Sequence, residues 1–222
     1  MSIIGINGKI GSGKDTIGEI IQKLCLTNKG GEFEIKKFAG KLKQTASLLT
    51  GIDIEMFEDQ EFKKTELGED WNYYPVIGYG HHNVPVYGQD EQAMLVREFL
   101  QKLGTEAMRD GLHTNVWINA LFADYRGPKM SEYNPSNWII TDMRFPNEME
   151  AIEERKGITI RVVRPHGYTN PHTGEYKEMP LSYHTSESAL DDAKFDYEII
   201  NDGSIEDLVE KVKQILITEK II

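Results

Sequence analysis

The sequence predicts an α/β fold built on a mostly parallel β-sheet, with helices on both faces and two irregular insertions. Apolar segments of strand length alternate with segments of helical periodicity along most of the chain, a pattern typical of this class. A glycine-rich loop lies between the first apolar segment and the first helical one. The length of 222 residues suits a single domain, residues 1–222, whose core needs no disulfide or metal.

The first half of the chain opens with a strand, a loop and a helix. Residues 2–7 are apolar and short enough for a buried strand. In the helical segment that follows, Ile17, Ile21 and Leu24 recur at helical spacing. The elements expected up to residue 125 are, in chain order, strand 2–7, helix 14–26, strand 34–38, helix 42–49, helix 91–109 and helix 116–125.

Residues 63–89 form the first insertion. The segment is rich in Tyr, Gly, Pro and His, which is typical of irregular structure. Residues 76–79 and 84–87 are expected to pair as a hairpin across residues 80–83. The aromatic side chains of this insertion either stack on a nucleobase or form a small core of their own. The sequence favours neither use.

The second half of the chain resumes the alternation of strands and helices. The elements expected there are strand 138–141, helix 146–156, strand 158–163, strand 197–200 and helix 205–216. A second segment rich in Pro, Gly and Tyr, residues 166–183, is the other insertion. Both insertions are candidate covers over a binding site.

Composition excludes several classes of protein. The 25 basic and 36 acidic residues give a net charge of −11, which argues against binding to a nucleic-acid polymer. No apolar run is long enough to span a membrane, and the N-terminus lacks the basic start of a signal peptide. The single Cys25 excludes an intramolecular disulfide and suits a reducing compartment such as the cytoplasm.

The most specific motif is Gly8-Lys9-Ile10-Gly11-Ser12-Gly13-Lys14, which matches the phosphate-binding pattern G-x-x-x-x-G-K. Its glycines let backbone N–H groups converge on phosphate oxygens, and the following helix adds partial positive charge. Lys14 would bridge the β- and γ-phosphates of a nucleotide. A glycine-rich turn without a ligand also produces such a match, but the strand before it and the helix after it favour a phosphate site.

Asp15 departs from this pattern, because a Ser or Thr usually occupies its position and meets Mg²⁺. A carboxylate beside a triphosphate is repulsive unless a metal ion or its waters lie between them. Two arrangements resolve the conflict. Asp15 orients Mg²⁺ through water, or it caps the helix while Thr16 supplies the hydroxyl. The sequence fits both.

Further charged residues complete the candidate site. Asp142 and Arg144 follow an apolar strand, and ligands of parallel sheets bind beyond the carboxyl ends of the strands. Asp142 would hold Mg²⁺ through water or accept a nucleotide hydroxyl, and Arg144 would hold a phosphate. A solvated pair that starts a helix is the alternative. A local positive pocket for phosphoryl transfer would be formed by Lys9, Lys14, Lys43, Arg97 and Arg144.

In chain order, these motifs resemble those of bacteriophage-type deoxynucleoside monophosphate kinases. The shared segments are Gly-Ser-Gly-Lys-Asp-Thr at 11–16, Ala-Gly-x-x-Lys at 39–43, Val-Arg-x-x-x-Gln-x-Leu-Gly-Thr at 96–105 with Trp117 one helix later, Asp-x-Arg-x-x-x-Glu-Met at 142–149, Val-Val-Arg-Pro at 162–165 and Ile-Asn-Asp-Gly-Ser at 200–204. They span most of the chain and leave out the two insertions.

The resemblance implies a three-layer P-loop kinase fold and an enzyme that transfers the γ-phosphate of ATP to a deoxynucleoside 5′-monophosphate. It also implies Mg²⁺ as cofactor, a homodimer, and action in the cytoplasm, that of the host if a phage encodes the chain. By matching motif, ATP contacts are expected from Gly11, Ser12, Gly13, Lys14, Asp15 and Thr16, the last two also near the metal. Acceptor contacts are expected from Lys9, Lys43, Arg97, Trp117, Asp142 and Arg144. Lys14, Asp142 and Arg144 are the expected catalytic residues.

The expected reaction is an in-line phosphoryl transfer. The acceptor phosphate is already an anion at neutral pH, so catalysis rests on positioning and charge neutralisation. One alternative is a kinase of the same fold that acts on another small phosphorylated metabolite. The other is a nucleotide-binding module that transfers nothing. An acceptor screen distinguishes the three.

Overall fold

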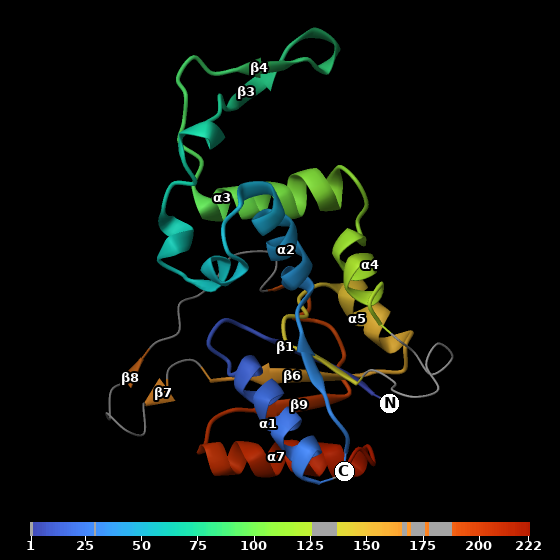
Figure 1. The fold of residues 1–222 in the computed structure, drawn as a ribbon. Coiled ribbons are helices and arrows are strands. Elements are labelled where there is room, and N and C mark those ends of the chain that lie inside the picture. Colours follow the sequence, from blue (N-terminus) through green and yellow to red (C-terminus); the bar gives the residue numbers. More distant parts are fainter. Residues whose placement is uncertain (1, 29, 126–136, 166–167, 170–175, 178–187) are drawn as a thin grey trace. The chain divides into compact units, whose positions relative to one another are not determined.

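The chain divides into two compact units, which we describe separately. The structure is a computed structural model that describes residues 2–28, 30–125, 137–165, 168–169, 176–177 and 188–222 (Figure 1). The first unit combines Met1–Ala39 with Ile118–Ile222, and the second unit is Gly40–Trp117.

A five-stranded parallel sheet forms the centre of the first unit. The strand order is β2-β5-β1-β6-β9, and every neighbouring pair is parallel. The strands are β1 (Ile3–Gly8), β2 (Glu34–Lys36), β5 (Trp138–Ile140), β6 (Ile158–Val163) and β9 (Tyr197–Ile200). Because all five run in one direction, their carboxyl ends lie along one edge of the sheet. The loops that leave this edge are therefore brought close together.

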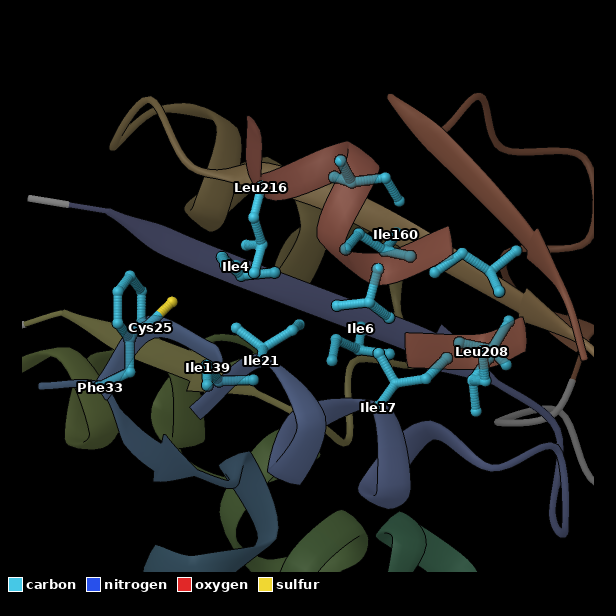
Figure 2. Packing of buried hydrophobic residues seen from close by; sticks show 14 residues of the cluster. Ile4, Ile6, Ile17, Ile21, Cys25, Phe33, Ile139, Ile160, Leu208 and Leu216 are labelled. Carbon is cyan, nitrogen blue, oxygen red and sulfur yellow. The ribbon is translucent and has the colours of Figure 1, made fainter. Parts of the chain in front are cut away.

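One face of the sheet is covered by α1 (Lys14–Thr27) and α7 (Ile205–Thr218), which also pack against each other. Ile17 and Ile21 of α1 and Leu208 and Leu216 of α7 meet the strand residue Ile4 in a buried cluster (Figure 2). These positions explain the helical periodicity of the sequence, since each is the inward side of an amphipathic helix.

The opposite face is covered by α5 (Pro146–Glu153) and by α4 (Val116–Phe122) from Ile118 onward. Met149 and Ile152 of α5 pack with Phe122 of α4 on Ile3 and Ile140 of the sheet. A helical layer on each face of a parallel sheet makes three layers. The predicted α/β fold class is therefore confirmed.

The second unit has its own small core. Ala46 of helix α2 (Phe38–Thr50) packs with Phe57, Val96 and Phe99. Its other elements are the 3₁₀ turns Ile54–Glu58, Phe62–Lys64, Glu69–Trp71 and His81–Asn83, the hairpin β3 (Val76–Tyr79) and β4 (Pro85–Tyr87), helix α3 (Val96–Gln101), and the π-helical segment Lys102–Asp110. The hairpin predicted in the first insertion is confirmed.

The helix predicted over residues 91–109 was wrong at its start and in its winding. Gln92 and Tyr73 exchange backbone hydrogen bonds of 2.9 and 3.0 Å, which holds the chain before Val96 extended against the insertion. From Lys102 the helix widens into π-helical turns. Periodicity did not reveal either feature, because both depend on residues distant in sequence.

In the described part of the second insertion, β7 (Tyr168–Thr169) pairs antiparallel with β8 (Tyr176–Lys177). The rest of the predicted segment 166–183 lies outside the described residues. Within the described ranges, none of the helices has the length and apolar character that crossing a membrane requires.

Candidate active site

The glycine loop joins β1 to α1 in a conformation that glycine makes possible. Gly11 and Gly13 have positive φ angles, 77° and 96°. A Cβ on Gly13 would also lie 2.5 Å from Nδ2 of Asn201, and one on Gly8 would lie 2.3 Å from Oγ of Ser12. Side chains at these positions would therefore force the loop open.

Side chains from neighbouring strand ends hold the loop. Asn201, directly after β9, donates from Nδ2 to the carbonyl oxygen of Ser12 at 2.8 Å. Arg164, directly after β6, donates from Nη1 to the carbonyl oxygen of Gly11 at 3.0 Å. Lys9 lies 3.5 Å from Oδ2 of Asp191. Two carbonyl oxygens that would repel an anion are thus engaged by the protein itself.

The Ser12 side chain points to the kind of ligand that fits the loop. Its hydroxyl oxygen is buried and has no hydrogen-bond partner within the described part of the chain. A buried polar atom without a partner is costly, by about 1–3 kcal/mol. A phosphate oxygen at the loop would satisfy this hydroxyl, so the loop geometry suits an anionic ligand.

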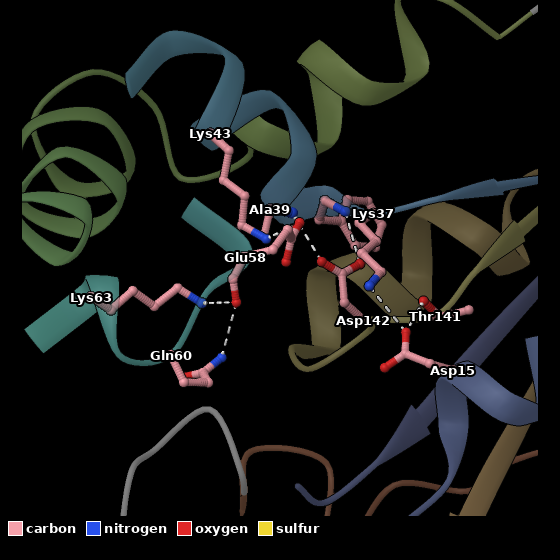
Figure 3. A network of polar contacts seen from close by, with 10 residues as sticks. Asp15, Lys37, Ala39, Lys43, Glu58, Gln60, Lys63, Thr141 and Asp142 are labelled. Atoms are coloured by element: carbon pink, nitrogen blue, oxygen red, sulfur yellow. Dashed lines mark hydrogen bonds and ion pairs between the residues drawn. The ribbon is translucent and has the colours of Figure 1, made fainter. Parts of the chain in front are cut away.

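Asp15 faces the sheet edge from the first turn of α1. Oδ1 of Asp15 accepts a hydrogen bond from the Thr141 hydroxyl at 2.9 Å and lies 3.1 Å from Nζ of Lys37 (Figure 3). Burial works to raise the pKa of Asp15, but Thr141 and Lys37, aided by the charge of Lys14, leave the pKa below its ordinary value. Asp15 is therefore a carboxylate, and Thr16 follows it, partly buried, in the same turn.

Asp142 caps helix α2. Its two carboxylate oxygens accept backbone N–H groups of Phe38 and Ala39 at 2.8 and 2.9 Å (Figure 3). Burial raises the pKa of Asp142, while these N–H groups and the positive charges of Arg144 and Lys37 oppose the rise. Thr141, which directly precedes Asp142, contacts Asp15 in the first turn of α1.

Three basic side chains gather in the second unit. Lys43 forms an ion pair with the Glu58 carboxylate. Lys63 donates to the carbonyl oxygen of Glu58 at 3.4 Å (Figure 3). Arg97 donates to Oε1 of Gln60, also at 3.4 Å. We call Lys43, Lys63 and Arg97 the basic cluster. Lys43 and Arg97 were predicted from the sequence.

Lys63 was missed, because it begins a segment whose composition suggested only a cover. Burial lowers the pKa of Lys63, and the charges of Lys43 and Arg97 lower it further. Neighbouring cations that depress a lysine pKa mark a place where an anion would be favourable. Lys63 is recognised as a site residue only by its closeness in space to Lys43 and Arg97. The order of residues in the sequence does not reveal that closeness.

Trp117 and the aromatic insertion have mainly packing contacts. The Trp117 indole is buried and donates to the carbonyl oxygen of Gly104 at 2.9 Å. Trp71 packs on Phe99, with ring centroids 4.8 Å apart. The hairpin aromatics, in contrast, are exposed. Of the two uses that the sequence left open, core packing therefore applies to Trp71, which packs in the core of the second unit. It does not apply to the exposed aromatic side chains of the hairpin.

Comparison with known proteins gives a consistent result. The sequence profile of the family described as deoxynucleotide monophosphate kinase matches residues 42–212. The deoxynucleoside-5′-monophosphate kinase of Escherichia phage T5 is 25% identical over 90% of this chain and 89% of its own length. The deoxynucleotide monophosphate kinase of Enterobacteria phage T4 is 30% identical over 57% of this chain and 47% of its own length. The T5 match extends over most of the chain, including regions before residue 42.

Proposed function

The chain belongs to the deoxynucleotide monophosphate kinase family and is a transferase, and we propose that it moves the γ-phosphate of ATP to a deoxynucleoside 5′-monophosphate, releasing ADP and the diphosphate. The observation that carries the donor site is the glycine loop, with its left-handed Gly13 and its buried, unsatisfied Ser12 hydroxyl. Both units act together in this proposal as one kinase domain, residues 1–222.

The donor site is built from the loop and the start of α1. Backbone N–H groups of Gly11 and Gly13 bind phosphate oxygens, aided by the partial positive charge of the helix N-terminus. The Ser12 N–H is engaged by the carbonyl oxygen of Lys9 at 3.1 Å and shapes the turn. Lys14 neutralises the β- and γ-phosphates. The Ser12 hydroxyl, for which no described residue is a hydrogen-bond partner, donates to a phosphate oxygen.

Oxygen donors beside the loop fit a magnesium ion. Thr16 offers a hydroxyl and Asp15 a carboxylate that stays ionised, and Mg²⁺ prefers such hard oxygen ligands together with phosphate oxygens and water. These two residues would hold the ion, directly or through water. When bound, Mg²⁺ supplies positive charge to the triphosphate. Thr141 and Lys37 orient the Asp15 carboxylate.

The basic cluster binds the acceptor phosphate. Lys43 forms an ion pair with Glu58, and the charge of the same carboxylate acts on Lys63. A dianionic phosphate would compete with that carboxylate for the three cations, and Arg97 would offer two parallel hydrogen bonds. No strong base is needed, because the attacking oxygen is already ionised.

Arg144 and Asp142 act at the carboxyl end of β5. In this proposal Arg144 stabilises charge on the moving phosphoryl group, and Asp142 holds the first turn of α2, the helix that carries Lys43. Lys9 and Trp117 support the site through Asp191 and Gly104 rather than by contact with the acceptor. Residues 166–183 remain a candidate cover that excludes water.

Three further expectations belong to the proposal. The enzyme works in the cytoplasm, that of the host if a phage encodes it, where ATP and deoxynucleotides are supplied. It works as a homodimer and without a nucleic-acid polymer as partner, in keeping with a net charge of −11.

The decisive experiment measures ADP release from Mg·ATP with each deoxynucleoside monophosphate and each ribonucleotide in turn. We expect strong turnover with at least one deoxynucleotide and little turnover without an acceptor. Binding of ATP without acceptor-dependent ADP anywhere in the panel would overturn the proposal. A further screen of other phosphorylated metabolites would then separate a kinase with another acceptor from a nucleotide-binding module.

A further inference from the structure

The hairpin of β3 and β4 leaves apolar side chains in solvent. Ile77, Tyr79 and Tyr87 are exposed by 69%, 71% and 57%. The two strands pair only with each other among the described strands. A two-stranded hairpin alone in water is marginally stable, and contiguous exposed apolar groups on a folded chain mark an interaction site. The hairpin therefore has the properties of a docking surface.

Charge is absent from this surface in a chain that is otherwise rich in it. From Trp71 to Gln89 the sequence contains no Asp, Glu, Lys or Arg, although such residues make up 27% of the chain. Exposed hairpins are usually protected from association by charged side chains, lysine above all. This hairpin lacks that protection.

Pairing in the hairpin shows which side chains share a face. Val76 lies opposite Tyr87, and Tyr79 lies opposite Pro85, because the register of β3 shifts between Val76 and Gly78. Residues opposite each other in an antiparallel pair point to the same side, and the alternation along β4 places Tyr87 and Pro85 on one side. Val76, Tyr79 and Tyr87 thus form one apolar face, which we call the hairpin face.

Prolines favour contact through this face rather than through the strand edges. Pro85 begins β4, and Pro75 directly precedes β3. A proline has no N–H to donate, and it discourages edge-to-edge pairing of strands. A partner would therefore bury the hairpin by packing against its side chains and not by adding a strand to its edge.

We propose that the hairpin face binds the same face of a second copy of this chain. A second copy presents an equally apolar and uncharged surface, and a two-fold contact brings identical patches together. Two chains of net charge −11 repel each other least where both are neutral. A partner drawn by charge would bind elsewhere on this acidic chain. The inference names the surface of the homodimer proposed above and is independent of the reaction.

Sedimentation velocity of the full chain tests the inference across a wide range of protein concentration. We expect the wild type to form a dimer, and Tyr79→Lys and Tyr79→Glu each to be monomeric, because like charges then face each other. An equimolar mixture of the two variants should dimerise again. Leu48→Lys is the control, since Leu48 is 85% exposed in the same unit but lies outside the hairpin. It should remain a dimer.

Several outcomes would overturn the inference. If the wild type stays monomeric at every concentration, both the proposed homodimer and the proposed contact through the hairpin face are wrong. Tyr79 variants that sediment like the wild type leave the dimer but exclude the hairpin face, and so does a mixture that stays monomeric. Circular dichroism should show the same secondary structure for the Tyr79 variants and the wild type, since the Tyr79 side chain is exposed in the single chain. The ADP assay tests the reaction separately, so a failure of the reaction and a failure of the hairpin face are distinguishable.

Discussion

Gly13 has a left-handed backbone conformation in the loop that is proposed to bind ATP. An alanine at this position would have to adopt φ near 96° with its Cβ about 2.5 Å from the Asn201 amide. The left-handed conformation alone costs about 1–2 kcal/mol for a residue with a Cβ. We expect Gly13→Ala to lower the free energy of unfolding by at least this amount, and to weaken ATP binding, as measured by urea unfolding and calorimetry.

Gly40→Ala is the matched control for Gly13→Ala. Gly40 lies in α2, and apart from the neighbouring backbone of the helix no atom of the described residues lies within 4 Å of an added Cβ. Alanine in a helix is favoured over glycine by up to about 1 kcal/mol, so this variant should be slightly more stable. Equal unfolding and equal ATP affinity for Gly13→Ala and the wild type would contradict the role assigned to Gly13.

Lys14 should matter for the rate more than for the fold. It is partly buried at the start of α1, and its charge already acts on Asp15. Removal of one charge that stabilises a transition state typically lowers kcat by about 10²–10³. We expect such a loss for Lys14→Ala in the ADP assay, and no loss for Lys23→Ala, which removes an exposed lysine from the same helix. Near-normal turnover of Lys14→Ala would refute the mechanism.

Lys63 predicts a dependence on alkaline pH. Burial and the charges of Lys43 and Arg97 hold its pKa below the ordinary value of 10.5, while Glu58 and Asp59 oppose them. A lowered pKa means that the proton leaves at a lower pH, so kcat/KM for the acceptor should fall as pH rises, before an ordinary lysine titrates. Arginine keeps its charge to higher pH, so Lys63→Arg should move this fall upward.

Lys64→Arg is the control for that pH profile. Lys64 is an exposed neighbour that pairs with Glu61, and its substitution should leave the profile unchanged. Lys63→Ala should lower kcat/KM for the acceptor at neutral pH, to a value below the one that the wild type reaches at high pH. An identical profile for Lys63→Arg and the wild type would show that the fall belongs to another group.

Helix α2 depends on a carboxylate supplied from far along the chain. Asp142 accepts the backbone N–H groups of Phe38 and Ala39, the first two residues of the helix. Loss of a helix cap costs about 0.5–2 kcal/mol, so Asp142→Ala should lower the free energy of unfolding by about 1 kcal/mol. Since α2 carries Lys43, the KM for the acceptor should also rise more than the KM for ATP.

Ser204→Ala separates the loss of a cap from the loss of a site. The Ser204 hydroxyl caps α7 by accepting from the Asp207 backbone N–H at 3.2 Å. Its removal should cost a similar stability without a selective change in the acceptor KM. If Asp142→Ala and Ser204→Ala affect the acceptor KM alike, Asp142 has no positioning role.

Two separate cores characterise the molecule as a whole. Phe57 is fully buried and packs within the second unit, while Leu216 is fully buried in the first. Phe57→Ala should cost about 3–5 kcal/mol, and hydrogen exchange should accelerate mainly within residues 40–117. Leu216→Ala should accelerate exchange mainly in the sheet and its helices. Equal acceleration in both units for either variant would show that they unfold as one.

Much of the first unit could be predicted from local pattern. Strand 158–163 and strand 197–200 were predicted with their observed bounds, because runs of β-branched and apolar residues bounded by turns are specific to strands. The helix after the glycine loop and the last helix were predicted to within two residues of their ends. These elements bury one face, and the period of their apolar residues shows it directly.

Several boundaries required residues distant in sequence. The strand predicted over 34–38 ends at Lys36, and the helix predicted from residue 42 begins at Phe38, because Asp142 supplies its cap. The helix predicted from residue 91 begins at Val96, because the insertion pairs with the chain before it. The periodicity of apolar residues within a segment gives no information about such distant partners.

The same division holds for the candidate site. The order of residues in the chain was enough to predict a phosphate-binding loop and to propose Asp142 and Arg144 as site residues, since such a loop is continuous and parallel strands end at one edge. Three contacts arise only from folding. Thr141 and Lys37 contact the Asp15 carboxylate, and Asn201 donates to the Ser12 carbonyl oxygen. Lys63 lies near Lys43. The physical reason is range. Backbone conformation and periodicity are local properties of neighbouring residues, whereas ion pairs, caps and the burial that shifts a pKa arise between segments that only the packed sheet and helices bring together.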